Sequence, residues 1–250
     1  MNPVRIDIVS DIVCPWCLIG TERLARALES SGVKAELVHH PFLLRPDTPE
    51  AGLDLREELR AKYGADPQAL FARVEAAARD SGIALDLSRQ GRQYPTVRAH
   101  TLLRHAGPKG TQEALARALF EAHFHEGKNV SDPEELRRIA RAHGFSDAET
   151  TRLVEDEQEL EHTRQEADAA RQQGILFHHS TGDFDAAGLR LRLQGEAPGA
   201  VLDCEAPAGK ELLRRGGVAS VRPAPMSPAK PRISPRCRVK SMPSNSVGWA

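Results

Sequence analysis

The sequence lacks several features that would narrow its function at once. None of its stretches reaches the roughly 20 consecutive apolar residues that a membrane-spanning helix requires. Near the N-terminus, Asp7 and Asp11 interrupt the apolar positions, so the uninterrupted apolar segment of a secretory signal is absent. Basic residues (34) and acidic residues (35) nearly cancel, to a net charge of -1. These features predict a cytoplasmic protein with no charge-driven affinity for nucleic acid or for an anionic membrane.

Cysteine is also scarce, with four in 250 residues. A chain of this length can bury a real hydrophobic core, as one elaborated domain or two small ones, so it needs no disulfide staples. In a reducing compartment a disulfide is more often catalytic than structural. The placement of the few cysteines therefore bears on chemistry.

The N-terminal part alternates between strand-like and helix-like patterns. Apolar and polar residues alternate over residues 4–10, which predicts a strand. Apolar residues at helical spacing then predict a helix from Pro15 to about Glu29, with a stop at Gly32. Renewed alternation over residues 33–42 predicts a second strand. Strand, helix and strand form a βαβ unit, whose two strands should pair in parallel.

After Pro46 the pattern becomes helical and stays so to about Gln173. Asp66-Pro67 is a start signal, and the stretches 131–134 (SDPE) and 146–149 (SDAE) are predicted capping boxes. Stops are supplied by glycines, namely Gly82, Gly107, Gly127 and Gly144. These signals predict about five helices, which is too many for a simple crossover. They indicate a helical subdomain inserted into, or following, the α/β unit.

Beyond Gly174 the regular pattern fails. Eight of the 17 prolines lie after Gly195, and residues 221–250 contain no acidic residue. Such a composition cannot bury enough apolar area to offset its ordering entropy, so the tail is predicted to be disordered. A period-two run at residues 189–194 can supply one strand. The predicted divisions are an N-terminal βαβ part (1–45), a helical subdomain (46–173), a divergent remainder (174–215) and a disordered, basic, proline-rich tail (216–250).

The sequence Cys14-Pro15-Trp16-Cys17 stands where the first strand gives way to the helix. Unpaired backbone N–H groups and the positive end of the helix dipole favour a nucleophilic thiolate at such a position. Cys14 is therefore predicted to attack a disulfide, and Cys17, one helical turn later, to resolve the mixed disulfide. Pro15 contributes no N–H and Trp16 offers a flat apolar surface, so both are predicted to contact a substrate polypeptide.

Other interpretations of the pair are open. Two cysteines at this spacing also occur by chance in a core, and thiolates at this spacing can chelate zinc. Zinc would need two more ligands, yet Cys204 and Cys237 stand alone in an irregular region, and His39-His40 end a strand. The strand-to-helix position inside a βαβ unit favours a redox couple without metal or cofactor. Cys204 and Cys237 are interpreted as incidental rather than as a second redox pair, and the two histidines as ordinary strand-end residues.

Several separated stretches carry a resemblance to a known family. Cys-Pro-Trp-Cys is followed by Ile19-Gly20 and Arg23-Leu24, and the further stretches are HHPFLLRPDTPEAGLDLREELRAKYG, TVRAHTLLRHA and ALFEAHFHEGKNVSDPEELRRIARAHG. Over about residues 4–175 the chain resembles the DsbA family of thioredoxin-fold oxidoreductases, in its FrnE-like branch of predicted dithiol-disulfide isomerases. The resemblance implies an α/β fold with a thioredoxin-like βαβ core and a large all-α insertion. It also implies a protein disulfide oxidoreductase that acts on protein or small-molecule thiols and disulfides.

The resemblance leaves alternatives open. Glutathione transferases of the kappa type and chromene-carboxylate isomerases are similar in fold, but they have a serine at the position of Cys14. The family continues beyond Gly174 with a Gly-Val-Pro segment whose proline is cis, two strands and a helix, whereas no proline occurs here between Gly174 and Pro198. The closing ββα part is therefore expected to be divergent or missing. A reading-frame shift near Gly174 that leaves an inactive product is one hypothesis, and a non-catalytic thiol- or metal-binding module is another.

Overall fold

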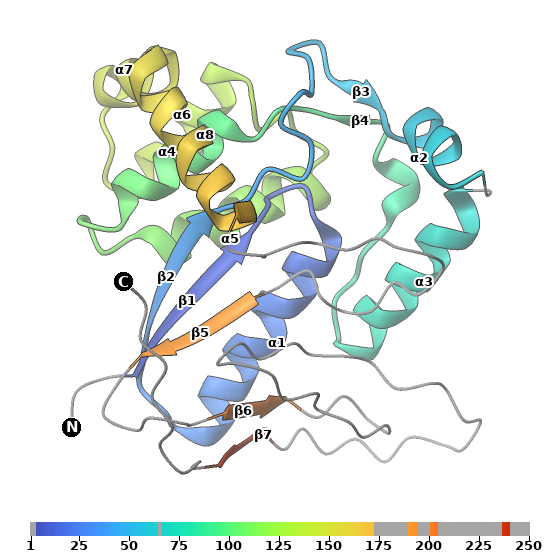
Figure 1. Cartoon of the computed structure of the whole chain (residues 1–250), viewed down its shortest axis with the longest axis vertical. Coiled ribbons are helices and arrows are strands. Elements are labelled where there is room, and N and C mark those ends of the chain that lie inside the picture. Colours follow the sequence, from blue (N-terminus) through green and yellow to red (C-terminus); the bar gives the residue numbers. More distant parts are fainter. Residues whose placement is uncertain (1–3, 65–66, 173–189, 195–200, 205–236, 241–250) are drawn as a thin grey trace.

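The computed structural model describes residues 4–64, 67–172, 190–194, 201–204 and 237–240. A three-stranded sheet lies at its centre, in the order β2-β1-β5. Its strands are β1 (Val4–Ser10), β2 (Ala35–Pro41) and β5 (Arg190–Gln194). Figure 1 shows two groups of helices, with α2 and α3 on one side of the molecule and α4 to α8 on the other.

The predicted βαβ core is confirmed. β1 and β2 pair in parallel, from Val4↔Ala35 to Ser10↔Pro41, and α1 (Pro15–Ser31) connects them. Ile6, Ile8 and Leu24 are almost fully buried between the sheet and α1. Burial of each such side chain stabilises the fold by about 1.5–3 kcal/mol. Gly32 ends α1 at φ 66°, a conformation that a residue without Cβ adopts at little cost.

The C-terminal strands qualify the prediction of an irregular tail. β5 pairs antiparallel with the free edge of β1, so the predicted strand in the period-two run is confirmed. β6 (Val201–Cys204) and β7 (Cys237–Lys240) pair with each other in a separate antiparallel sheet. The four residues of β7 lie within the tail that the sequence predicts to be disordered. The rest of that tail, and most of 174–215, lie outside the described residues.

The helical region contains more helices than predicted. Within the described residues it holds seven α-helices instead of about five: α2 (Leu55–Tyr63), α3 (Pro67–Asp80), α4 (Val97–Ala106), α5 (Gln112–Phe124), α6 (Pro133–Arg141), α7 (Asp147–Glu155) and α8 (Glu157–Gln172). A 3-10 helix, η1 (Leu87–Arg89), and a two-residue ladder of β3 (Leu53–Asp54) with β4 (Arg92–Gln93) join the two groups. The separation of α7 from α8 depends on Asp156 alone. Its backbone is extended and its carboxylate accepts the N–H of Gln158, so it caps α8.

One predicted cap is confirmed and another is shifted by a residue. The Ser146 hydroxyl accepts the N–H of Glu149, which is one of the two hydrogen bonds of the predicted capping box, while the Glu149 carboxylate contacts Lys109. In the stretch 131–134, however, the cap of α6 is Asp132, whose carboxylate accepts the N–H of Glu134. The hydroxyl of Ser131 instead accepts a hydrogen bond from the Arg98 guanidinium.

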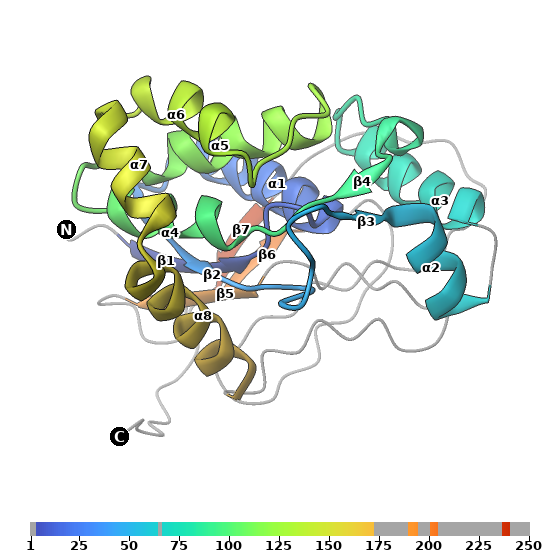
Figure 2. The ribbon, with the colours of Figure 1, turned by 90° about the horizontal axis from the view of Figure 1, so that it is seen from above.

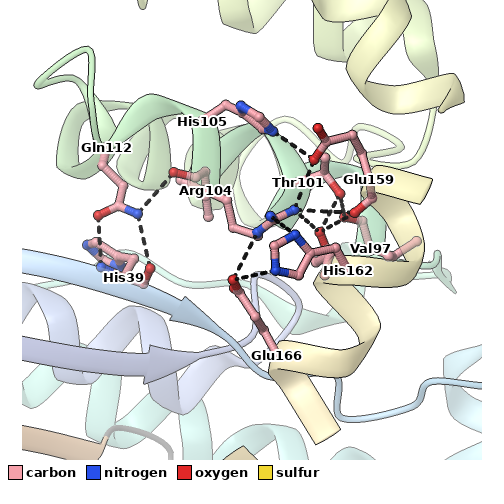
Figure 3. Close-up of polar contacts among 11 residues, drawn as sticks. His39, Val97, Thr101, Arg104, His105, Gln112, Glu159, His162 and Glu166 are labelled. Atoms are coloured by element: carbon pink, nitrogen blue, oxygen red, sulfur yellow. Dashed lines mark hydrogen bonds and ion pairs between the residues drawn. The ribbon is translucent and has the colours of Figure 1, made fainter. Parts of the chain in front are cut away.

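The α4–α8 group docks on the sheet through β2, which α4, α5 and α8 all contact. Figure 2 shows this group from above, clustered over β1 and β2. The buried Gln112 side chain joins the parts (Figure 3). It accepts the N–H of His39 at 2.9 Å and donates to the carbonyls of His39 and Leu103 at 3.0 Å each. One amide therefore satisfies backbone groups of both β2 and α4.

Candidate active site

The two cysteines occupy the turn that sequence analysis predicts. β1 ends at Ser10, and Cys14 is the N-cap of α1, with an extended backbone (φ -93°, ψ 110°) and Pro15 in the first helical turn. Its N–H donates to the carbonyl of Asp11 at 3.1 Å, which closes the turn. The carbonyl of Cys14 accepts the N–H of Cys17 at 3.0 Å, which begins the helix. The backbone thereby holds Cys14 at the positive end of α1.

Neither cysteine forms a disulfide, and both are buried, with exposed fractions of 1% for Cys14 and 0% for Cys17. Burial, followed by a hydrogen bond with the Cys14 side chain, raises the pKa of the Cys17 thiol well above its usual range. The negative charge of Asp11 acts in the same direction. Cys17 therefore holds its proton at neutral pH while it lies against Cys14.

Cys14 faces a pocket of about 120 Å³ between the N-terminus of α1 and the α2–α3 group. By the measure on which one water needs about 10–15 Å³, this volume takes several waters or a side chain. Its walls are mainly apolar, with Trp16, Leu55, Leu59, Phe71, Val74, Leu87 and Phe124 among the lining residues. Three cations also line it, Arg45, Lys62 and Arg92, and no carboxylate does among the described residues.

The other two predicted site residues lie in this pocket as well. Pro15 is half-buried in the lining, whereas Trp16 is only 7% exposed and forms part of the wall. The indole Nε1 of Trp16 is buried and has no hydrogen-bond partner in the part of the chain that the structure describes. Cys17 is not part of the lining and sits behind Cys14. The structure thus brings all four residues together, with Cys14 foremost.

Three buried titratable residues near the cysteines were missed by the sequence analysis. The Asp11 carboxylate accepts the N–H of Leu44 at 2.7 Å and lies 3.4 Å from Nε2 of His100. His123, near the end of α5, lines the pocket, and burial lowers the pKa of its imidazole from 6.5 to about 4. Asp11 stands three positions before Cys14, but the two histidines come from distant helices, so only the tertiary fold brings them here.

The strand-end histidines take structural roles, as predicted. His39 Nε2 lies 2.7 Å from Glu113 Oε2, and His40 Nε2 lies 2.8 Å from Asp7 Oδ1. Neither histidine lines the Cys14 pocket. Across the described residues no three His, Cys, Asp or Glu side chains gather as a set of metal ligands, so zinc binding gains no support there. Searched over the same residues, the chain has no helix long and apolar enough to cross a membrane.

Comparisons with known proteins place this geometry in a family context. A family model described as a DSBA-like thioredoxin domain matches residues 5–176. The uncharacterized protein YwbO of Bacillus subtilis (strain 168) is 27% identical over 172 residues, which span 66% of this chain and 82% of YwbO. The matched segment of the family model ends two residues past Gly174, close to where the regular sequence pattern fails.

Solved structures of several proteins are similar to this chain in fold. The probable DsbA oxidoreductase SCO1869 from Streptomyces coelicolor is similar at 30% identity and a TM-score of 0.61, over 68% of this chain and 76% of that one. A 2-hydroxychromene-2-carboxylate isomerase aligns at 15% identity and a TM-score of 0.55, over 70% and 82%. The cytosolic disulfide reductase DsbM from Pseudomonas aeruginosa with GSH aligns at 17% and 0.50, over 76% and 89%. The last two show likeness of fold alone, and the predicted thioredoxin-like fold is confirmed.

Proposed function

Since this chain belongs to the DSBA-like thioredoxin-domain family, we propose that it is a thiol-disulfide oxidoreductase whose reacting pair is Cys14 and Cys17. The observation that carries the proposal is the arrangement of the two sulfurs. Cys14 caps α1 and opens into a pocket, and the protonated Cys17 thiol lies against it on the buried side. This arrangement supports attack by one thiol and resolution by the other.

The reaction proceeds in two exchanges. The Cys14 thiolate attacks one sulfur of a substrate disulfide, the substrate S–S bond breaks, and the departing thiolate takes a proton from solvent. A mixed disulfide then joins Cys14 to the other substrate sulfur. Cys17 loses its proton and attacks Cys14, which releases the second substrate thiol and leaves a Cys14–Cys17 disulfide. The same steps in reverse oxidise a dithiol substrate, and an external thiol or disulfide resets the pair.

The lining of the pocket is suited to a thiol substrate that has both apolar and acidic groups. Its apolar wall suits a side chain next to the reacting cysteine, and the cations at its edge suit a carboxylate. Glutathione, named with the DsbM structure, carries two carboxylates and a thiol and is therefore one small thiol to test. Protein disulfides are the other class, as the resemblance to the family implies.

The finer assignments are part of the proposal. We propose further that the protein isomerises disulfides and belongs to the FrnE-like branch of the family. We also propose that it resides in the cytoplasm, which cell fractionation tests. The presence of Cys14 disfavours an isomerase of the chromene-carboxylate type, because the resemblance gives that class a serine at this position. A reading-frame shift near Gly174 agrees with the end of the family match. Resequencing the gene in several isolates tests the shift, and an intact frame in all of them contradicts it.

Insulin reduction by the full-length protein, with dithiothreitol as the terminal reductant, tests the proposed function. We expect the wild-type protein to accelerate precipitation of the insulin B chain and Cys14→Ser to abolish the acceleration. The matched control replaces the other two cysteines, in a Cys204→Ser, Cys237→Ser double variant, and should keep the activity. If Cys14→Ser is as active as the wild type, Cys14 is not the attacking thiol and the proposed mechanism is wrong.

A further inference from the structure

His123 is a buried polar side chain in the Cys14 pocket with no role in the exchange steps. It lies next to the last residue of α5, and only 4% of the residue is exposed. The side chain of Gln90 donates to its carbonyl at 3.0 Å and to that of Phe124 at 3.1 Å, which fixes this end of α5 beside the pocket. The Phe124 ring meets the imidazole edge-on, at 4.6 Å between centroids.

The imidazole of His123 has no hydrogen-bond partner among the described residues, unlike two other buried histidines of the chain. His39 contacts Glu113, and His100 contacts Asp11. A buried imidazole needs a hydrogen-bond partner, and for His123 that partner is water in the pocket or a polar group of a bound ligand. Unlike Trp16 Nε1, the ring nitrogens of His123 are not fully enclosed by protein atoms. A molecule bound in the pocket can therefore contact them.

The protonation state of His123 narrows the chemistry of that partner. Burial keeps the ring neutral at physiological pH, since its pKa falls to about 4. A neutral imidazole offers one N–H donor and one acceptor nitrogen. A peptide group offers the complementary acceptor and donor, whereas a carboxylate offers acceptors only and is better matched by the three cations of the pocket.

We infer that His123 is a substrate-binding residue, which hydrogen-bonds the peptide amide adjacent to the reacting cysteine of a bound disulfide. The inference rests on the proposed function and assigns the peptide backbone as the feature that the pocket recognises. In an apolar pocket a few polar groups fix the orientation of a ligand, and His123 is one of the neutral polar side chains of this lining, together with Tyr63, Gln90 and Gln93. The contact places the substrate sulfur before Cys14 without itself transferring a proton.

Two small disulfides separate the amide contact from a general effect on the fold. N,N'-diacetylcystine bis(methylamide) carries peptide groups beside each sulfur, whereas diethyl disulfide carries no hydrogen-bonding group. The measured quantity is the second-order rate at which each disulfide oxidises the reduced full-length protein, followed by mass-tagging of Cys14 and Cys17. The variants are His123→Leu, His123→Gln, and His125→Leu as a matched control from outside the pocket lining.

We expect His123→Leu to lower the rate with the bis-amide by about five- to tenfold, the usual effect of deleting one neutral hydrogen bond. The rate with diethyl disulfide should stay within about twofold, because that molecule has no amide to lose. His123→Gln keeps a donor and an acceptor and should recover most of the rate, and His125→Leu should change neither rate. Equal losses with both disulfides, or no loss with either, would overturn the inference and leave His123 with a packing role or a bound water.

A measurement on the wild-type protein covers the case in which His123→Leu does not fold. The ring nitrogens of His123 are followed by ¹⁵N NMR while N-acetyl-S-ethylcysteine methylamide, which cannot exchange, is added. We expect a saturable shift of a ring nitrogen that ethyl methyl sulfide does not produce, and identical responses to both compounds would contradict the inference. If instead the reduced wild-type protein reacts with neither disulfide, it is the proposed function that fails.

Discussion

Two polar regions of this protein, each at least partly buried, differ in how completely their groups are paired. In the α4–α8 network, made by Thr101, Arg104, His105, Glu159, Thr163 and Glu166, the side chains bond to one another across the two helices (Figure 3). In the Cys14 pocket, Trp16 Nε1 is buried without a hydrogen-bond partner among the described residues, and the His123 imidazole contacts the Phe124 ring and the pocket. Side chains that bond to one another hold the two helices in place, whereas polar groups without such a bond beside Cys14 remain available to a substrate.

Substitutions in the two regions should therefore affect different properties of the protein. Thr101 and Thr163 meet at 2.8 Å with no exposed surface, and the Thr163 hydroxyl also accepts a hydrogen bond from Arg104. A buried network of this kind is specific only while every member is satisfied. We therefore expect substitutions in the network to change stability, and substitutions at the pocket to change activity.

The largest expected effect is on turnover, at Cys17. Replacement by serine removes the resolving thiol but not the attacking one, so Cys17→Ser should lower turnover by at least about 1000-fold and leave a mixed disulfide on Cys14. Mass spectrometry of the protein after reaction with a peptide disulfide identifies the modified cysteine. A mixed disulfide on Cys204 or Cys237 instead, or unchanged turnover, would show that the pocket is not the reacting region.

The second effect is on stability and concerns the burial of His123. Its pKa is about 4 in the folded protein and about 6.5 when unfolded, so between these values the unfolded chain binds more protons. This group therefore lowers the free energy of unfolding as pH falls from 6.5 to 4, by about 3 kcal/mol in full. Denaturant titrations of the wild type and His123→Leu across this range should differ in pH dependence by that amount. If the two pH profiles are parallel, His123 is not buried as a neutral group.

The smallest of these effects belongs to the paired region. Thr101→Val keeps the shape but deletes one hydroxyl and with it the Thr101–Thr163 hydrogen bond, while the Thr163 hydroxyl keeps Arg104 and the Glu159 carbonyl, so the change should cost about 1 kcal/mol of unfolding free energy. Combination with Thr163→Val should cost less than the sum of the single changes, because the double variant leaves neither hydroxyl behind. Thr101→Ser is the control, since it retains the hydroxyl. A strict sum, or a loss of activity in Thr101→Val, would erase the distinction between the two regions.

Local sequence signals predict the framework of the site and little of its interior. Pro15 after the first strand, and Gly32 after the helix, are enough to place Cys14 at a strand-to-helix junction, because caps and stops act over a few residues. The break at Asp156 was missed, since one capping residue between two helical patterns resembles a continuous helix. His100 and His123 were missed for another reason: their approach to Cys14 depends on how the helices pack, which no local pattern encodes.

The central claim is that Cys14 and Cys17 form one redox couple, and an equilibrium redox titration tests it most directly. The full-length protein is equilibrated in glutathione buffers of graded potential, and the free thiols are mass-tagged and assigned to positions. We predict that Cys14 and Cys17 lose their tags together, in a single two-electron transition between about -270 and -120 mV, while Cys204→Ser, Cys237→Ser titrates identically. A pair that stays tagged at every potential, or closes only with Cys204 or Cys237, would contradict the account.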